Sequence, residues 1–301
     1  MSHTSSKDLI RNFSENSNIK PISYQLSAMR IQGLTRASGN QRIVLCLHGW
    51  LDNAASFFPL LSCLDDNNII AIDWPGHGYS GHRSAGAHYH FFDYVYDLLE
   101  LFESNQWENV DIVGHSMGGM IGSAFAAAFP EKVRSLTLID ALGFIYSDEE
   151  KATEQLRLAM ISRLKNNQSA GRNKTRYFSK ETAVKARLSV SDLTDRDASL
   201  LVDRSLLQKG EEFCWRSDNK LRTLSPYRLT LGQARQLMKD IECPVKLIYA
   251  TKGLKMIQEY LPLAEQLIKS FSAETLVGGH HIHMEQPIEV AKIIKHFLLD
   301  T

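Results

Sequence analysis

The pentapeptide Gly114-His115-Ser116-Met117-Gly118 constrains the fold more than any other stretch of the chain. The apolar run 110–113 precedes it, and an Ala-rich stretch, 119–128, follows it. A buried strand, a tight Gly-x-Ser-x-Gly turn and a helix together form the context of a nucleophile elbow, in which the serine occupies a strained turn. Glycine on both sides of the serine relieves the crowding that larger side chains would cause. We therefore expect Ser116 Oγ at the top of a sheet, although a Gly-rich turn with an uninvolved serine would have the same pattern.

The other apolar segments predict the sheet that this turn requires. Continuous apolar runs, which are typical of strands buried on both faces, occur at 42–47, 68–72, 136–139 and 245–250. Residues 274–277 are expected to form a last short strand. Helical spacing between them favours a parallel sheet with right-handed crossovers. Two alternating segments, 22–26 and 29–35, predict an antiparallel pair at the start. We expect an α/β fold with a mostly parallel, eight-stranded sheet flanked by helices.

The buried-strand pattern stops after Gly143 and resumes near residue 241. The stretch between them carries helical segments and charge-rich runs, and it is too long to be a loop. We predict a helical cap over 144–240, inserted into a core formed by 1–143 and 241–301. Residues 1–20, which are rich in Ser and Asn, are expected to form a loose leader.

Composition excludes several classes of function. Lys+Arg and Asp+Glu each number 34, so no net charge favours a nucleic acid partner. The cysteines form no C-x-x-C pair and are expected to be reduced core thiols rather than disulfides or zinc ligands; they are Cys46, Cys63, Cys214 and Cys243. The polar N-terminus lacks the apolar core of a secretory signal, and no apolar run approaches membrane-spanning length. We expect a cytoplasmic protein without a membrane partner.

A serine hydroxyl needs a general base, usually histidine, and a carboxylate that fixes the histidine tautomer. The candidate base is His280, in the Gly-Gly-His-His-Ile-His segment 278–283 between the last predicted strand and helix. His280 is preferred to His281 and His283 because it directly follows the two glycines and lies seven residues before Pro287. Two alternatives remain: the three histidines could bind a metal, or one of His281 and His283 could lie on the surface.

The acid is harder to assign. An aspartate would be expected after the strand 245–250, but the sequence there reads Ala250-Thr251-Lys252-Gly253, with glycine at the expected position. No carboxylate follows until Glu259, inside a predicted helix. Asp140 ends the preceding strand of the series and would reach the same sheet edge. An aspartate that only caps the following turn would look the same. We favour Asp140 because the later position lacks a carboxylate.

Stabilisation of a developing negative charge requires two backbone N–H groups. One is expected from Met117, the residue after the serine. The other is expected from Trp50, in the loop His48-Gly49-Trp50 that follows the first buried parallel strand. A tight turn between strand and helix would also explain the His-Gly pair, and both interpretations can hold together.

Assembled in this order, the motifs resemble those of α/β-hydrolase-fold enzymes. The matching segments are His48-Gly49-Trp50, the Asp-Trp-Pro-Gly-His-Gly-Tyr-Ser run 73–80, the Ser116 pentapeptide, Phe-Pro-Glu-Lys-Val at 129–133, and Gly279-His280 through Pro287. Within that superfamily the chain is most similar to the serine hydrolase-like proteins, through segments 213–221, 225–230 and 279–285. The resemblance implies a serine nucleophile, no cofactor and an ester-like substrate. Gly253 departs from the pattern, because many relatives carry their acid there, and Asp140 is supported by relatives that use the earlier strand.

These observations predict a carboxylesterase-like serine hydrolase whose partner is a small-molecule, ester-like substrate. Serine at position 116 argues against the dehalogenases and epoxide hydrolases of this fold, which use an aspartate nucleophile. Hydrolysis of a C–C, thioester or amide bond by the same residues is one alternative. A non-catalytic, ligand-binding relative is the other, and its only support is the glycine at 253. A homodimer is left open.

Overall fold

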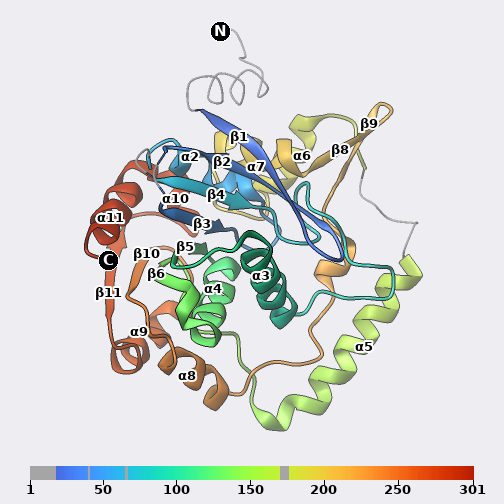
Figure 1. Cartoon of the computed structure of the whole chain (residues 1–301). Helices are drawn as coiled ribbons and strands as arrows, with labels where there is room; N and C mark the ends of the chain where they lie inside the picture. The colour runs from blue at the N-terminus through green and yellow to red at the C-terminus, as the bar shows by residue number, and fades with distance from the viewer. Residues whose placement is uncertain (1–17, 40, 65–66, 170–175) are drawn as a thin grey trace.

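The computed structural model describes residues 18–39, 41–64, 67–169 and 176–301 (Figure 1). Most of the predicted leader therefore lies outside the described residues, and the first strand begins at Ile19. The main sheet has eight strands, as the sequence predicts. In spatial order they are β1 (Ile19–Gln25), β2 (Arg30–Arg36), β4 (Asn68–Ile72), β3 (Ile43–Leu47), β5 (Val110–His115), β6 (Val133–Ile139), β10 (Val245–Ala250) and β11 (Phe271–Leu276). The β1–β2 and β2–β4 pairs are antiparallel, and every other neighbouring pair is parallel.

Helices cover both faces of this sheet and close a separate hydrophobic core on each. One core is formed with α3 (Phe91–Asn105), α4 (Met117–Ala128), α8 (Leu231–Lys239) and α9 (Met256–Leu267). The other is formed with η1 (Ala54–Phe57), α2 (Phe58–Leu61), α10 (Ile282–Glu285) and α11 (Pro287–Leu299). Strand β3 shows the alternation that this requires, because Leu45 and Leu47 enter the first core while Val44 and Cys46 enter the second. Burial on both faces explains why the strands are continuous apolar runs.

Between β6 and β10 the described residues form the helices α5 (Ala152–Ser169), α6 (Lys180–Leu188) and α7 (Asp195–Ser205), followed by α8. They also form a small antiparallel sheet that the sequence did not reveal, in the order β7 (Arg176–Tyr177), β9 (Glu212–Trp215) and β8 (Leu206–Lys209). Helix α7 ends at Ser205, and β8 begins at the next residue. Gly210, with a φ of +62°, turns the chain between β8 and β9. The division into core and cap stays a prediction.

A buried ion pair fastens α7 to the main sheet. Asp73 follows β4, and its fully buried carboxylate accepts hydrogen bonds from Ala54 N and Tyr79 N, each at 2.8 Å. Arg204 of α7 completes its shell, with Nε at 2.9 Å from Oδ1 and Nη2 at 2.8 Å from Oδ2. These bonds compensate the cost of burying both charges. The Asp73 segment therefore holds α7 against the main sheet.

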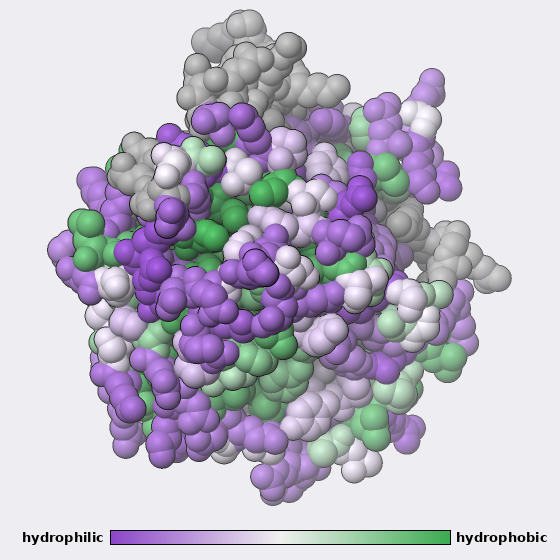
Figure 2. Space-filling model, viewed as in Figure 1, coloured by the Kyte–Doolittle hydropathy of each residue, from purple (hydrophilic) through white to green (hydrophobic). Residues whose placement is uncertain are grey.

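Figure 2 shows hydrophilic side chains over most of the visible face, with hydrophobic residues in separate groups between them. Within the described ranges, none of the helices combines the length and apolar character needed to cross a membrane. The four cysteines form no disulfide within the described residues; Cys63 is partly exposed and the other three are buried.

Candidate active site

Ser116 occupies the turn between β5 and α4, where the sequence predicts it. Its φ of 50° and ψ of −121° lie outside the regions that residues with side chains ordinarily adopt, so the turn is strained. The surrounding backbone leaves no room for larger neighbours, since a Cβ on Gly118 would lie 2.1 Å from Leu47 O. A Cβ on Gly114 would lie 2.5 Å from Gly119 Cα. The glycines therefore permit a close approach of backbone segments that holds the serine at the sheet edge.

Three side chains from distant segments form a continuous row at this edge. Ser116 Oγ lies 3.0 Å from His280 Nε2, and His280 Nδ1 lies 2.6 Å from Asp140 Oδ2. His280 comes from the loop between β11 and α10, and Asp140 directly follows β6. The structure thus brings together the three residues that the sequence singled out for nucleophile, base and acid. A hydroxyl, an imidazole and a carboxylate in this order can move a proton from serine to histidine.

Asp140 is fully buried and has a positive φ of 42°. Its Oδ1 accepts a hydrogen bond from Ala250 N at 3.0 Å, and its Oδ2 accepts one from Leu254 N at 2.9 Å. The loop after β10 therefore wraps around the carboxylate. A Cβ on Gly253 would lie 2.0 Å from Asp140 Oδ1 and 2.4 Å from Oδ2. Glycine at 253 leaves the space that the Asp140 carboxylate fills.

The loop after β3 presents a backbone N–H whose direction is fixed by His48. Trp74 N donates to His48 Nε2 at 3.0 Å, so the ring proton lies on Nδ1, which donates to Gly49 O at 2.7 Å. In a trans peptide the carbonyl and the next N–H point in opposite directions, so Trp50 N–H points away from His48. Met117 is the first residue of α4, and its N–H has no partner within the helix.

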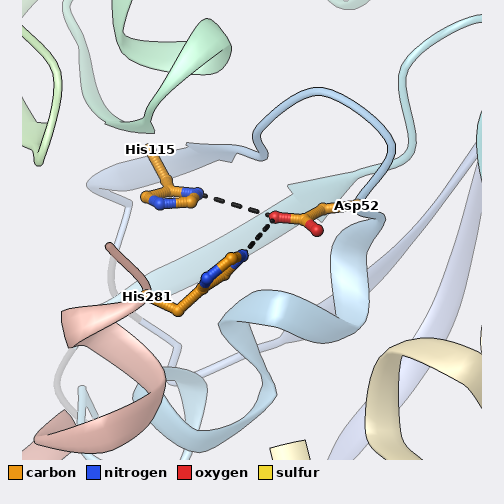
Figure 3. A group of neighbouring side chains, drawn as sticks. All are labelled: Asp52, His115 and His281. Atoms are coloured by element: carbon orange, nitrogen blue, oxygen red, sulfur yellow. Dashed lines mark hydrogen bonds and ion pairs between the residues drawn. The ribbon is translucent and has the colours of Figure 1, made fainter. Parts of the chain in front are cut away.

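A charged network next to His280 was not predicted from the sequence. Figure 3 shows three of its members, Asp52, His115 and His281. His281 Nε2 lies 3.2 Å from Asp52 Oδ2, and His281 Nδ1 lies 3.3 Å from Asp192 Oδ1. His115 Nδ1 points toward the same Asp52 oxygen at 3.7 Å. Burial lowers the pKa of His281, but Asp52 and Asp192 outweigh it and raise that pKa to about 9. His281 is therefore a cation at neutral pH.

This geometry bears on both alternatives for the histidine run, a surface position and a metal site. His281 and His283 are both buried, so the expectation that one of them lies on the surface is wrong. Donor atoms of Asp52, His115 and His281 lie within 4.8 Å of one another, a spacing that a metal ion could bridge. The positive charge beside Asp52 is, however, already supplied by His281 and by Arg187, whose Nη2 lies 2.5 Å from Asp52 Oδ1. The donor set therefore fits an ion-pair network better than a metal centre.

Asp192 links this network to the candidate base. Its Oδ2 accepts a hydrogen bond from His280 N at 2.7 Å, which holds the backbone of that loop.

The histidine run was the only feature of the sequence that pointed to this network. The partners of His281 are 89 and 229 residues away along the chain, so no local spacing pointed to them.

A cavity of about 1150 Å³ opens onto Ser116 and His280. Its wall combines the Gly49–Asp52 loop with residues of the inserted segment, among them Tyr177, Arg187 and Trp215. The hydroxyl, the imidazole and the Gly49–Asp52 loop therefore face one shared volume, which is partly open to solvent. Sites that bind small molecules are commonly concave volumes of this order.

The fold and the row at its edge define an α/β hydrolase. A family model for the alpha/beta hydrolase fold matches residues 42–287, and the chain belongs to this family. Family membership supports hydrolase activity.

Individual relatives agree with this assignment. A serine hydrolase-like protein of Danio rerio is 32% identical over 277 residues, covering 89% of this chain and 85% of that protein. Serine hydrolase-like protein 2 of Homo sapiens is 30% identical, with coverage of 86% and 87%. The crystal structure of a hypothetical protein from Pseudomonas aeruginosa PAO1 has a TM-score of 0.87 at 33% identity, covering 93% of this chain and 99% of that one. A thioesterase domain from the curacin biosynthetic pathway shares the fold, with a TM-score of 0.81 at 21% identity over 92% of this chain and 99% of that domain.

Proposed function

We propose that this protein is a serine hydrolase that cleaves small, ester-type substrates through Ser116, His280 and Asp140. The observation that supports this most directly is the pair of contacts at 3.0 Å and 2.6 Å that joins the three side chains. Asp140 accepts the Nδ1 proton and thereby keeps His280 Nε2 available as a base. The non-catalytic alternative was supported by the glycine at 253, and the contact between Asp140 and His280 supports the catalytic proposal over it.

In the first half-reaction His280 Nε2 accepts the proton of Ser116 while Oγ attacks the acyl carbon. The N–H groups of Met117 and Trp50 stabilise the oxyanion. His280 then returns the proton to the leaving alcohol as the C–O bond breaks. In the second half-reaction the same nitrogen deprotonates a water molecule, which attacks the acyl-enzyme, and the proton returns to Ser116 Oγ.

A fluorophosphonate probe and p-nitrophenyl acetate test the proposal together. The wild-type protein should be labelled at Ser116 and should release p-nitrophenol, and Ser116→Ala should lose both. Ser217→Ala is the matched control, because Ser217 lines the same cavity outside the row. Unchanged labelling and turnover in Ser116→Ala would refute the role of Ser116.

The core residues do not determine which bond is cleaved. A panel of p-nitrophenyl ester, thioester and anilide substrates with the same acyl group distinguishes ester hydrolysis from the thioester and amide alternatives. A vinylogous 1,5-diketone tests C–C cleavage. We expect the largest kcat/KM for the ester, and a larger value for another member would transfer the same mechanism to that bond.

A further inference from the structure

The cavity wall is positively charged although the protein as a whole is balanced. Lys+Arg and Asp+Glu each number 34 in the chain, yet the cavity is lined by four basic side chains and only two acidic ones. The basic residues are Lys165, Arg187, Arg222 and Lys252, and the acidic residues are Asp52 and Asp192. Protonated His281 adds to the excess. A concave site lined by one sign of charge raises the local concentration of ligands of the opposite sign.

The two carboxylates offset the charges of Arg187 and protonated His281, with which they are already paired, and not the charge of Arg222. Asp52 is bonded to Arg187 and to His281. Asp192 is bonded to the other side of His281 and accepts the N–H of His280. Neither carboxylate is therefore left to neutralise Arg222, which comes from a different part of the cavity wall.

Arg222 stands out among the four cations. Burial lowers the pKa of Arg222, Tyr177 opposes this, and the positive charge of Arg187 lowers it further. Across the described ranges, no ion pair connects Arg222 to a carboxylate. Arg222 lines the cavity and stays accessible to a ligand, and the positive charge of Arg187 favours the binding of an anion beside it. An anionic ligand in the cavity would supply the missing charge.

The backbone that carries Arg222 is fixed relative to the candidate oxyanion site. Arg222 ends the short helix η4 (Asn219–Arg222), and Asp218 caps its start by accepting from Lys220 N. Immediately before Arg222, Leu221 O accepts a hydrogen bond from Trp50 Nε1 at 3.2 Å. The same tryptophan supplies the proposed oxyanion donor, so the backbone that carries Arg222 is tied to the loop of that donor.

We propose that Arg222 binds an anionic oxygen group, a carboxylate or a phosphate, at the end of the substrate remote from the scissile ester. This inference rests on the proposed function, because it assigns the remote end of the substrate cleaved at Ser116. The planar guanidinium binds two oxygens of such a group side by side. Arg187 adds to the positive potential near Arg222, and its bond to Asp52 holds its side chain in place.

A set of p-nitrophenyl esters tests the carboxylate form. Acetate is compared with the half-esters of succinate, glutarate and adipate, whose acyl groups end in a carboxylate at increasing distance. At least one half-ester should exceed acetate in kcat/KM by about 10- to 100-fold, the range expected for a hydrogen-bonded charge pair. Arg222→Gln should remove that advantage, mainly by raising KM, and should leave acetate hydrolysis within about two-fold. Arg228→Gln is the matched control, since Arg228 is an exposed arginine of the same segment that does not line this cavity.

Calorimetric titration with glutarate and with inorganic phosphate measures the anion site without turnover. Binding of glutarate that Arg222→Gln abolishes supports a carboxylate substrate, and binding of phosphate alone supports a phosphate one. If neither anion binds and no half-ester is preferred, the inference is refuted even when acetate is hydrolysed and Ser116 is labelled. Failure of Ser116 labelling with intact anion binding would instead refute the proposed function and leave the anion site established.

Discussion

Replacement of Gly253 by alanine tests the role of Asp140 without mutating any of the three proposed catalytic residues. The added Cβ would lie 2.0 Å from Asp140 Oδ1 and 2.4 Å from Oδ2, whereas real Cβ contacts essentially never fall below 3.0 Å. The carboxylate must therefore move by about 1 Å or the loop must open. Either change lengthens the 2.6 Å contact to His280 and disturbs the hydrogen bonds from Ala250 N and Leu254 N.

The size of the effect has a lower and an upper bound. A misplacement of about 1 Å in a reacting constellation costs roughly 10²-fold in rate. Complete loss of the orienting carboxylate costs roughly 10⁴-fold. We therefore expect Gly253→Ala to lower kcat by about 10² to 10⁴, or about 2.7 to 5.5 kcal/mol of transition-state stabilisation. Gly253 and Leu254 also line the cavity, so kcat rather than KM reports on the contact between Asp140 and His280.

Steady-state hydrolysis of p-nitrophenyl acetate measures this loss, and circular dichroism verifies the fold. Gly86→Ala is the matched control, because a Cβ there would meet nothing within 4 Å. A Gly253→Ala variant with kcat within three-fold of the wild-type value would show that Asp140 does not orient His280.

The double variant Asp140→Gly/Gly253→Asp adds a gain of function to the same reasoning. The Cβ at 253 would lie 2.4 Å from the present position of Asp140 Oδ2, close to the separation of Cβ and a carboxylate oxygen within an aspartate. Glycine at 140 also tolerates the positive φ of 42°. The double variant should recover at least ten-fold of the activity lost in Asp140→Gly, and no recovery would contradict a shared carboxylate position.

Protonated His281 should stabilise the fold, because its folded pKa of about 9 exceeds the ordinary value of 6.5. This stabilisation amounts to about 3 kcal/mol; it is fully present below pH 6.5 and is lost as the pH rises through 9. Urea unfolding across this range should show that the free energy of unfolding falls more steeply with pH in the wild type than in His281→Asn. Equal slopes in the two proteins would contradict the role of His281. Arg204→Leu should lower the free energy of unfolding by about 3 kcal/mol, because buried Asp73 loses its counter-charge. Arg176→Leu, which breaks an exposed pair, should cost less than about 1 kcal/mol, and similar losses in the two variants would contradict the anchoring role of Arg204.

Most of the sheet could be predicted because its central parallel strands are encoded locally as largely apolar runs, whereas the edge strand β11 is mostly polar and exposed. Ser116 and His280 could be singled out for a similar reason, since glycines mark the turns that carry them. Asp140 was reached only by elimination, because the reason for glycine at 253 is the contact of its loop with a carboxylate 113 positions earlier. The His281 network was missed because its carboxylates come from two other parts of the chain. Long-range polar pairing of this kind leaves no periodic trace in a sequence.

The position of the acid follows from how two neighbouring strands end. Strands β6 and β10 are parallel and in register, with Ile139 beside Ile248, so the chain leaves both strands at the same corner of the sheet. This corner has room for one carboxylate. Because Asp140 fills the space, the loop after β10 must carry a glycine at position 253. The inserted segment meets the same corner from the other side, since Asp192 holds the backbone of His280. Substitutions in that segment can therefore alter the rate of reaction as well as the choice of substrate.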